Sequence, residues 1–467
     1  MAIQIYNSLT KRKEEFQPLN PPIVKMYTCG VTVYDRCHIG HARSLYVFEV
    51  MRRYLQFRGF KVKFVRNITD VDDKIIAKAV ETKKTSQEVS EEQIRFYYQD
   101  LEALNISKAD EEPQATQDIP EMIKHIQGLI DKGFAYAVGG DVYFHVRAFK
   151  DYGKLSGQSI EAMVEAVRIE KDSHKKDPLD FALWKASQEG EPGWNSPWGK
   201  GRPGWHIECS CMSMKHLQTQ TLDIHAGGRD LIFPHHENEI AQSESLTGKT
   251  FVRYWLHHGL LTMNGQKMSK SLGNFVTIPQ ALAQYTVDEI KMFFLFSHYA
   301  SGIDFTDEKM LEARKVLSKF DILFWKAAEL LKDKDVEPFQ ADFISTHKQE
   351  FLEAMDDDFN TPKALAALFN LISDTNKLID ENQKDPHYLG VIYHAVDVLE
   401  NLGRQIFGLF LKEKEKELTD DLKQLLNDRV AARRAKNFKR SDELRELLKS
   451  KGVAVEDGKS GQTWRWI

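Results

Sequence analysis

The stretch that decides the fold is IVKMYTCG at residues 23–30, an apolar run that stops at a cysteine and a glycine. A short apolar run bounded in this way predicts a buried strand. After a loop, apolar residues recur three or four apart from about His41 to Leu55, which predicts a helix. Gly59 suits the C-terminal end of that helix, and Val62 to Val65 resume a strand pattern. This strand–helix–strand order builds parallel sheets.

The edge of such a sheet is where function is expected, because ligands bind beyond the carboxyl ends of parallel strands. Cys29, His38 and the segment from Asp70 to Asp73 all follow predicted strands. We therefore expect them to lie at one edge of an α/β domain with a parallel sheet.

Composition excludes several classes of protein. A chain of 467 residues, with 42% hydrophobic and 28% charged residues, is ordinary for a globular protein of several domains and rules out a mainly disordered one. No stretch approaches the ~20 apolar residues of a membrane span, and the first residues lack the apolar run of a secretory signal. We expect a cytoplasmic protein with no membrane partner.

Net charge and cysteine content limit the ligands and partners that the chain is expected to bind. The formal net charge is -5, so the chain as a whole does not indicate a nucleic-acid partner, and any basic surface must be local. Four cysteines, Cys29, Cys37, Cys209 and Cys211, are too few for a disulfide scaffold. A reducing compartment would keep them as thiols, which makes metal binding their functional alternative.

Further parts of the chain differ in pattern. A Gly139-Gly140 turn lies within a segment that interrupts the sheet domain, the spacing after about Phe305 is helical, and Lys412 to Glu417 alternates charge like a linker. The predicted division is a sheet domain in two halves at 1–112 and 195–251, an inserted connective subdomain at 113–194, a region with a lysine-containing loop at 252–310, an α-helical bundle at 311–411 and a small C-terminal module at 418–467.

The segment His38-Ile39-Gly40-His41 falls in the first strand-to-helix loop. A helix N-terminus favours phosphate, Gly40 lets the backbone approach a ligand closely, and two imidazoles can donate to phosphate oxygens. The pattern therefore indicates a nucleotide site. Alone it is weak evidence, because histidines near a helix start are more often surface or capping residues.

A second segment, KMSKS at 267–271, places two lysines and two hydroxyls between Gly265 and Gly273. Such a segment suits a mobile loop that closes on a triphosphate. Alone, a solvated basic turn would be the better interpretation. Both segments occur in the expected order on one α/β chain, however, and chance does not readily produce that pair.

The pair resembles the HIGH and KMSKS signatures of class I aminoacyl-tRNA synthetases, without substitution. Further segments are similar to those of cysteinyl-tRNA synthetases: YTCGVTVYD at 27–35, NITDVDDK at 67–74, GWHIECS at 204–210, FPHHENE at 233–239, and VEDG to WR between 455 and 465. The resemblance covers nearly the whole chain. It implies a Rossmann-like class I catalytic domain that uses ATP, accompanied by Mg²⁺, to join L-cysteine to tRNA(Cys).

A metal site can be argued from the residues themselves. His235 and Glu239 are four apart, so on a helix they share a face with Cβ atoms ~5–6 Å apart. Cys29 ends a strand of the same sheet, and Cys209 lies before a predicted strand at 222–224. Two thiolates, an imidazole and a carboxylate form a set that zinc accepts. For any single one of them a position in the core is the simpler interpretation.

The resemblance assigns these four residues together as the ligands of one zinc ion per chain. Cys37, Cys211 and His236 do not match the family's ligand positions, and we assign them to packing or to contacts behind the ligands. Zinc suits a cysteine substrate, because a small pocket separates near-isosteres such as serine by only ~10² or less. Zinc binds a thiol strongly and lowers its pKa, whereas a hydroxyl is a poor ligand at neutral pH.

Four protein ligands normally mark a structural zinc, so an open position for the substrate sulfur is implied by the resemblance alone. Thr69 and Trp205 come from segments similar to the family's cysteine pocket and could line that position, or each could be a core residue.

Adenylate formation needs no protein nucleophile, because the cysteine carboxylate attacks the α-phosphate of ATP. Positioning and stabilisation of phosphate charge suffice. The resemblance implies that His38, Gly40 and His41 bind ATP. It also implies that Lys270 stabilises the α-phosphate region and that Lys267 assists loop closure. The two histidines and the two lysines are thus the expected catalytic residues.

The tail supplies a candidate surface for tRNA. From Arg429 to Lys451, nine lysines and arginines accompany three acids, which makes a local basic patch. Trp464 and Trp466 add faces on which bases could stack. A solvated helix face is the alternative. By resemblance, the tail and the preceding bundle bind the anticodon side of tRNA, and the region at 252–310 contacts its stem.

Two other functions stay open at this stage. A cysteine ligase of mycothiol biosynthesis would share the fold, the zinc site and the adenylate chemistry, but such ligases generally lack the tail module. A catalytically silent RNA-binding paralogue would not need all the residues of the two motifs. We expect a monomer.

Overall fold

The structure is a computed structural model that describes residues 2–166, 174–268, 273–381, 387–411, 418–458 and 461–466. The chain forms two compact units, Met1–Phe410 and Leu411–Ile467. The predicted linker at 412–417 and the predicted catalytic Lys270 lie outside the described residues. No described helix combines the length and the apolar character that crossing a membrane requires.

A four-stranded parallel sheet forms the centre of the first unit, in the order β11-β10-β3-β4. Its strands are β3 (Ile23–Thr32), β4 (Lys61–Thr69), β10 (Leu222–Gly228) and β11 (Val252–His258). In the inner strand β3, Tyr27 lies opposite His225 of β10 on one side and Val65 of β4 on the other. The predicted strand–helix–strand unit and the α/β fold are confirmed.

Strand β3 continues beyond the cysteine and glycine at which the apolar run ends. Its register with β4 is irregular between Thr28 and Val31. Gly30 lies in this irregular part, where a Cβ atom would stand 1.6 Å from the carbonyl oxygen of Asn67. Only glycine fits there, because the two backbones approach too closely for a side chain.

Helix α1 (Ile39–Phe57) joins β3 to β4 and begins two residues before its predicted start. The reason is its cap, since the His38 side chain accepts hydrogen bonds from the N–H groups of Gly40 and His41. Arg58 ends the helix, and Gly59 follows with a φ of +88°, a left-handed backbone that favours glycine.

A small sheet carries the beginning of the second motif. It has the order β13-β12-β14 and consists of β12 (Leu261–Met263), β13 (Gln266–Lys267) and β14 (Ile303–Phe305). The helices α8 (Ile278–Leu282) and α9 (Val287–Leu295) lie between β13 and β14 in the sequence. Lys267 therefore ends a strand, next to the part of the motif that lies outside the described residues.

One buried arginine fixes α1 to the backbone beside this small sheet. Arg43 is only 1% exposed. Its guanidinium donates to the carbonyl oxygens of Gly259 at 2.7 Å, Leu260 at 3.0 Å and Tyr299 at 3.3 Å, and to that of Ser301. Burial lowers the pKa of Arg43 to about 10. The arginine thus holds the helix that begins with HIGH against the strands that lead to Lys267.

The segment between β4 and β10 contains a second sheet, antiparallel and five-stranded, in the order β5-β6-β7-β9-β8. Its strands are β5 (Ala135–Val138), β6 (Asp141–Phe144), β7 (Phe181–Ala186), β8 (Trp194–Ser196) and β9 (Gly199–Pro203). The helices of this segment are α2 (Asp73–Thr82), α3 (Ser86–Ala103), α4 (Ile119–Asp131), α5 (Ile160–Ala166) and α6 (Trp205–His216). Helix α7 (Glu237–Thr247) joins β10 to β11, and β1 (Gln4–Asn7) pairs with β2 (Arg12–Glu15) near the N-terminus.

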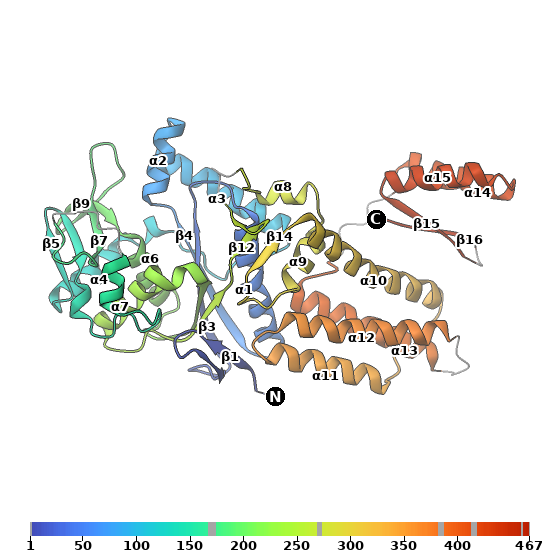
Figure 1. The fold of residues 1–467 in the computed structure, drawn as a ribbon, viewed down its shortest axis with the longest axis horizontal. Coiled ribbons are helices and arrows are strands. Elements are labelled where there is room, and N and C mark those ends of the chain that lie inside the picture. The colour runs from blue at the N-terminus through green and yellow to red at the C-terminus, as the bar shows by residue number, and fades with distance from the viewer. Residues whose placement is uncertain are drawn as a thin grey trace. The chain divides into compact units, whose positions relative to one another are not determined.

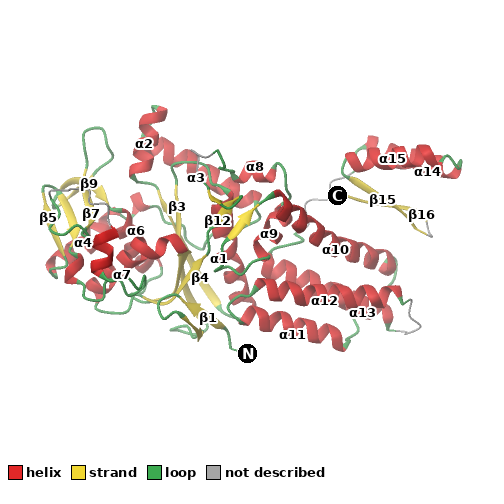
Figure 2. Ribbon diagram, viewed as in Figure 1, coloured by secondary structure: helices red, strands yellow, loops and turns green. Residues whose placement is uncertain are grey.

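Helices dominate the rest of the first unit, as Figure 2 shows. They are α10 (Asp307–Leu331), α11 (Asp342–Asp356), α12 (Thr361–Asp380) and α13 (Tyr388–Leu402). In Figure 1 these helices and the five-stranded sheet lie on opposite sides of the four-stranded sheet. The predicted helical pattern after about Phe305 is therefore confirmed.

The second unit is a helical hairpin with a two-stranded antiparallel sheet. Its elements are α14 (Asp420–Arg434), α15 (Phe438–Ser450), β15 (Val453–Gly458) and β16 (Gly461–Trp466). Arg429 is fully buried and donates to both carboxylate oxygens of Asp457, at 2.9 and 2.8 Å. Arg433 and Arg445 reach the same carboxylate, at 2.7 and 3.0 Å. Three of the basic residues counted in the tail therefore bind an acid of their own unit.

We expect Arg43→Met to lower the free energy of unfolding by about 2 kcal/mol, because methionine keeps an apolar stem but removes the guanidinium that donates to four carbonyl oxygens. Three of these carbonyls, those of Gly259, Leu260 and Tyr299, also accept a hydrogen bond from another donor, which limits the loss. The matched control is Arg12→Met. The Arg12 side chain is 75% exposed, so its loss should cost about 0.5 kcal/mol or less. Urea unfolding followed by circular dichroism measures both. Equal stability of the two variants would contradict the role of Arg43.

Candidate active site

A cavity of about 420 Å³ opens at the carboxyl edge of the parallel sheet. Its walls come from the ends of β3 and β10, the start of α1, and β12 and β13. The predicted site residues Cys29, His38, His41, Trp205 and Lys267 all line this cavity. The structure thus joins the two sequence motifs to the cysteine of the predicted metal site.

The HIGH histidines lie at the N-terminus of α1, His38 as its cap and His41 in its first turn, with ring centroids 3.8 Å apart in a stacked pair. His38 Nδ1 accepts from the N–H of Gly40 at 3.1 Å and from that of His41 at 3.3 Å. His41 Nδ1 accepts from the N–H of His38 at 3.2 Å. A neutral imidazole that accepts at Nδ1 carries its proton on Nε2, so each ring retains an Nε2–H donor.

Burial keeps both imidazoles neutral at pH 7. It lowers the pKa of His38 to about 4. Burial, with smaller contributions from His38 and Lys74, lowers the pKa of His41 to about 3. Gly40 is required between the rings, because a Cβ there would lie 2.9 Å from the His38 ring. The first turn of α1 therefore supplies two fixed, uncharged hydrogen-bond donors.

The second motif reaches the cavity through Lys267 and Met268, which both line it. Lys267 is exposed at the end of β13. Lys270 lies outside the described residues, so its place at the α-phosphate stays a prediction.

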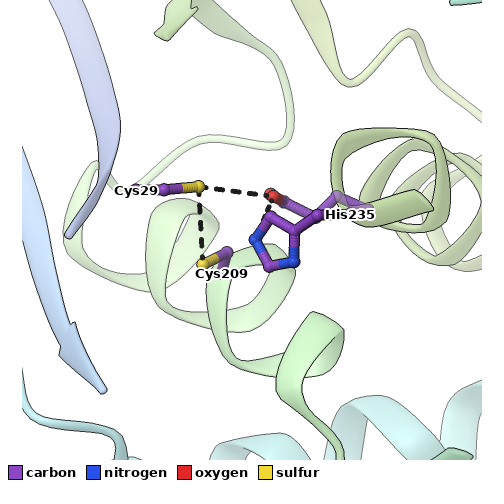
Figure 3. Close-up of side chains that lie close together, drawn as sticks. Cys29, Cys209 and His235 are labelled. Atoms are coloured by element: carbon purple, nitrogen blue, oxygen red, sulfur yellow. Dashed lines mark hydrogen bonds and ion pairs between the residues drawn. The ribbon is translucent and has the colours of Figure 1, made fainter. Parts of the chain in front are cut away.

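Four side chains from three parts of the chain form a compact cluster beside the cavity. Cys29 comes from β3, Cys209 from α6, His235 from the turn before α7, and Glu239 from the first turn of α7. Their ligand atoms all lie within 4.8 Å of one another. Figure 3 shows the sulfur atoms of Cys29 and Cys209 turned toward each other beside the His235 ring. This is a group that could hold one metal ion.

The distances in the cluster are short throughout. Cys29 Sγ lies 3.8 Å from Cys209 Sγ and 3.7 Å from Glu239 Oε1, and His235 Nε2 lies 3.1 Å from that oxygen. Cys209, His235 and Glu239 are all buried. Cys209 stands on a helix, which the sequence pattern ahead of the strand at 222–224 did not indicate.

The cluster mixes charges of both signs in a buried place. A hydrogen bond from Cys29 lowers the pKa of Cys209 to about 6, whereas burial raises that of Cys29 well above its ordinary value. Burial alone would lower the pKa of His235, but Cys209 and Glu239 raise it to about 10. Burial likewise opposes ionisation of Glu239, yet His225 and His235 lower its pKa to about 2. Mutual attraction therefore keeps Cys209, His235 and Glu239 charged, whereas Cys29 stays a neutral thiol.

A second group of possible ligands shares Cys29 and Glu239 and adds His225 and His236. His236 Nε2 lies 3.3 Å from Cys29 Sγ, and its Nδ1 lies 2.8 Å from His257 Nε2. His225 Nε2 lies 2.8 Å from Glu239 Oε2, so it fixes the carboxylate oxygen that His235 does not approach. Sequence reasoning missed His225, because a histidine inside a buried strand carries no local signal of its partner.

The two residues of the predicted cysteine pocket differ in exposure. Trp205 is 38% exposed, lines the cavity and stacks on His235 with ring centroids 4.1 Å apart. Thr69 is buried at the end of β4, where its hydroxyl donates to Glu208 at 2.8 Å. Trp205 is therefore placed between the cavity and the metal cluster, whereas Thr69 is not among the described residues that line the cavity.

The other two cysteines lie in apolar surroundings. Cys37 and Cys211 are buried in hydrophobic cores, and burial raises the pKa of each to about 12. Within the described residues, neither belongs to a group that could hold a metal ion.

Several further residues line the cavity that no motif argument had singled out. They are Tyr34, Arg66, Lys74, Asp230 and His258. Lys74 closes the quoted segment at 67–74, and Tyr34 is the last residue but one of the segment at 27–35; their position after predicted strands was the available signal.

Comparison with known proteins covers the whole chain. Residues 15–315 match the family model described as the tRNA synthetases class I (C) catalytic domain, residues 350–412 the DALR domain, and residues 415–465 the cysteinyl-tRNA ligase anticodon binding domain. Cysteine–tRNA ligases of Persephonella marina and of a Sulfurihydrogenibium species are each 48% identical, with 100% of both chains covered. That of Aquifex aeolicus is 46% identical over 100% of this chain and 99% of its own. The chain belongs to the cysteine–tRNA ligase family.

A cysteine–tRNA ligase is an ATP-dependent enzyme with a class I catalytic domain, as the resemblance had implied. Solved structures agree on the fold. A methionyl-tRNA synthetase of Mycobacterium tuberculosis in complex with methionyl-adenylate superposes with a TM-score of 0.68 at 16% identity, over 83% of this chain and 92% of that one. A second structure, of the M. tuberculosis enzyme bound by methionyl-adenylate, gives 0.64 at 16% identity, with the same coverage.

We expect the buried histidines of this cysteine–tRNA ligase to make stability depend on pH in a defined window. In the unfolded chain, the imidazoles of His38 and His41 bind protons near pH 6.5, whereas in the folded protein their pKa values are about 4 and 3. Their contribution to the free energy of unfolding is therefore complete above pH 6.5 and is lost as the pH falls toward 4. Each contributes a slope of up to about 1.4 kcal/mol per pH unit. Urea unfolding between pH 4.5 and 7.5 should give a shallower slope for His38→Gln/His41→Gln than for the wild type.

The control for this slope is His347→Gln. Burial lowers the pKa of His347, but hydrogen bonds to Asp374 and Glu350 raise it further than burial lowers it. Removing the His347 imidazole should therefore change the slope of stability against pH in the direction opposite to that of the double variant. An unchanged slope in the folded double variant would show that the two imidazoles are not protected from protonation.

Proposed function

We propose that this cysteine–tRNA ligase activates L-cysteine with ATP in the cavity described above and then transfers the cysteinyl group to the terminal adenosine of tRNA(Cys). One observation carries the proposal. A single cavity is lined both by Cys29 of the metal cluster and by the histidines that begin α1. A thiol-selecting group and a phosphate-binding helix end therefore face one space.

In the first step, a carboxylate oxygen of cysteine attacks the α-phosphorus of ATP. An oxygen–phosphorus bond forms, the bond from the α-phosphorus to the bridging oxygen breaks, and pyrophosphate leaves with the electron pair. The Nε2–H groups of His38 and His41 can donate to phosphate oxygens without changing protonation. Lys267, and by our prediction Lys270, add positive charge where negative charge grows. Catalysis here is positioning and electrostatic stabilisation.

The metal cluster fits zinc. Its donors are two sulfurs, one imidazole nitrogen and one carboxylate oxygen, a combination that zinc accepts. Nε2 of His235 is buried and is not aligned for a hydrogen bond with any described residue, so a metal ion would satisfy it. Nδ1 of His235 lies 2.9 Å from His206, a contact that orients the ring as in many metal sites. Zinc bound by Cys29, Cys209, His235 and Glu239 would supply a soft Lewis acid that prefers a thiol to a hydroxyl.

Other parts of the proposal concern the surroundings of the reaction. Trp205 forms the wall of the cysteine pocket, Thr69 supports the helix of Trp205 through its hydrogen bond to Glu208, and Mg²⁺ enters with ATP. The division of the chain into a split catalytic domain, an inserted subdomain, a bundle and a tail module stays a prediction, as do the monomeric state and the cytoplasmic location.

The proposed function is tested by cysteine-dependent exchange of pyrophosphate into ATP, followed by transfer to tRNA. Both activities are expected, and serine should support neither. Exchange without transfer to tRNA would favour another acceptor, such as the glucosamine-inositol acceptor of mycothiol synthesis. Binding of tRNA without exchange would mean a catalytically silent RNA-binding protein.

We expect Cys209→Ser to lose zinc while Cys211→Ser keeps it. The two cysteines lie two residues apart on α6, but only Cys209 belongs to the metal cluster. Metal analysis of both purified proteins, each with its circular dichroism spectrum, is the measurement. Undiminished zinc in folded Cys209→Ser would sink the ligand assignment.

We expect the tail to act on tRNA and not on adenylate formation. Arg434, Lys436 and Lys439 are exposed, whereas Arg429, Arg433 and Arg445 bind Asp457. Changing the three exposed residues to alanine should leave pyrophosphate exchange unchanged and weaken tRNA binding. The slope of log affinity against log salt should become shallower by about 2, since each phosphate contact contributes roughly 0.7 to 0.9. Deleting residues from Thr419 onward should do the same more strongly.

Aminoacylation and filter binding at two salt concentrations measure these effects. If the deleted but folded enzyme charges tRNA as well as the full chain, the tail has no part in tRNA binding.

A further inference from the structure

Besides Lys267, a second lysine lines the described part of the cavity, and it comes from an element that belongs to neither signature. Helix α2 begins at Asp73, directly after the loop that follows β4, and Lys74 in its first turn lines the cavity with His38, His41 and Lys267. Lys74 is exposed, so its ammonium is open to a ligand.

The acids next to Lys74 are bound elsewhere. Asp72 caps α2, and its carboxylate accepts from the backbone N–H of Lys74 at 2.9 Å. Asp73 pairs with Lys185 of β7 at 2.7 Å and also with Arg202 of β9. These contacts hold the first turn of α2 against the five-stranded sheet. They fix the backbone of Lys74 without neutralising its side chain.

The Lys74 ammonium is held over a ring instead of an acid. Its Nζ lies 5.3 Å from the centroid of Tyr34, which also lines the cavity. Within the described part of the chain, Lys74 forms no ion pair. Its charge reaches the HIGH segment, because Lys74 contributes, after burial and His38, to the lowered pKa of His41. An unpaired cation therefore faces the same space as the two imidazole donors.

We infer that Lys74 binds the triphosphate of ATP, at the phosphates that leave as pyrophosphate. The inference rests on the proposed function. ATP carries several negative charges, and the described part of the cavity offers Lys267 as its other lysine. The two neutral Nε2–H donors cannot neutralise the negative charge of a triphosphate. An ammonium group already in place beside them can supply part of the positive charge that is needed. Because the contact exists from the moment ATP binds, it acts mainly on affinity.

The experiment compares Lys74→Met with the wild type in cysteine-dependent pyrophosphate exchange. The KM for ATP should rise about tenfold, the effect of one lost charge-assisted contact. The KM for cysteine and kcat should each stay within about twofold. Lys74→Arg should recover most of the affinity, which a merely structural role of the lysine stem would not explain. The matched control is Lys78→Met, one turn later on α2, where Lys78 pairs with Glu81 at 3.1 Å.

Calorimetric binding of ATP without cysteine gives a second readout that needs no turnover. The Kd for ATP should be about tenfold higher for Lys74→Met than for the wild type. Unchanged Kd and KM values would overturn the inference. So would a defect confined to single-turnover transfer of cysteine from preformed adenylate to tRNA, because that would place the lysine on a phosphate of the tRNA end. If the wild type showed no exchange, the proposed function would fail while the calorimetry still decided the role of Lys74.

Discussion

The site depends on the parallel pairing of β3 with β10. This pairing sets Tyr27 opposite His225, so Cys29, two residues further along β3, lies beside the end of β10 and the start of α7. His225 holds Glu239 from within β10, and Glu239 in turn lies 3.7 Å from Cys29. A slip of one residue in this register would turn every side chain of β3 to the other face of the sheet. Cluster and cavity would be lost together.

Buried titratable groups have different charge states at the two ends of this arrangement. Where α1 begins, it removes charge, because an imidazole whose Nδ1 accepts backbone N–H bonds can remain neutral and still donate. In the metal cluster, acids and bases lie 3 to 4 Å apart, so their attraction outweighs the loss of solvent and His235 and Glu239 stay ionised. The protein thus offers phosphate neutral hydrogen-bond donors and offers a metal cation the carboxylate of Glu239, while His235 ligates a metal once it has given up its proton.

Sequence patterns predicted the features whose signals are local. The apolar run at 23–30 and the spacing after His41 located a strand and a helix to within a few residues, and two short motifs in the right order indicated the family. What they missed depends on contacts between distant segments. Charge counting placed Arg429 in a basic surface, yet it is buried against Asp457, and no periodicity could reveal that His225 supports Glu239. Local patterns identify elements, whereas the neighbours of an element follow from the register of the sheets.

The hydrogen bonds of Arg43 tolerate substitution of the residues that accept them but not of the arginine that donates them. All four acceptors are backbone carbonyls, which every amino acid possesses, so the side chains of Leu260 and Ser301 can vary without removing an acceptor. The donor side has no such freedom, since only arginine presents five N–H groups in a planar fork. Gly259 is restricted for a separate reason, because a Cβ would lie 2.2 Å from the Ser301 carbonyl oxygen. Natural variation at this junction should therefore be concentrated in the two loops that supply the acceptors, while the helix contributes a single invariant side chain.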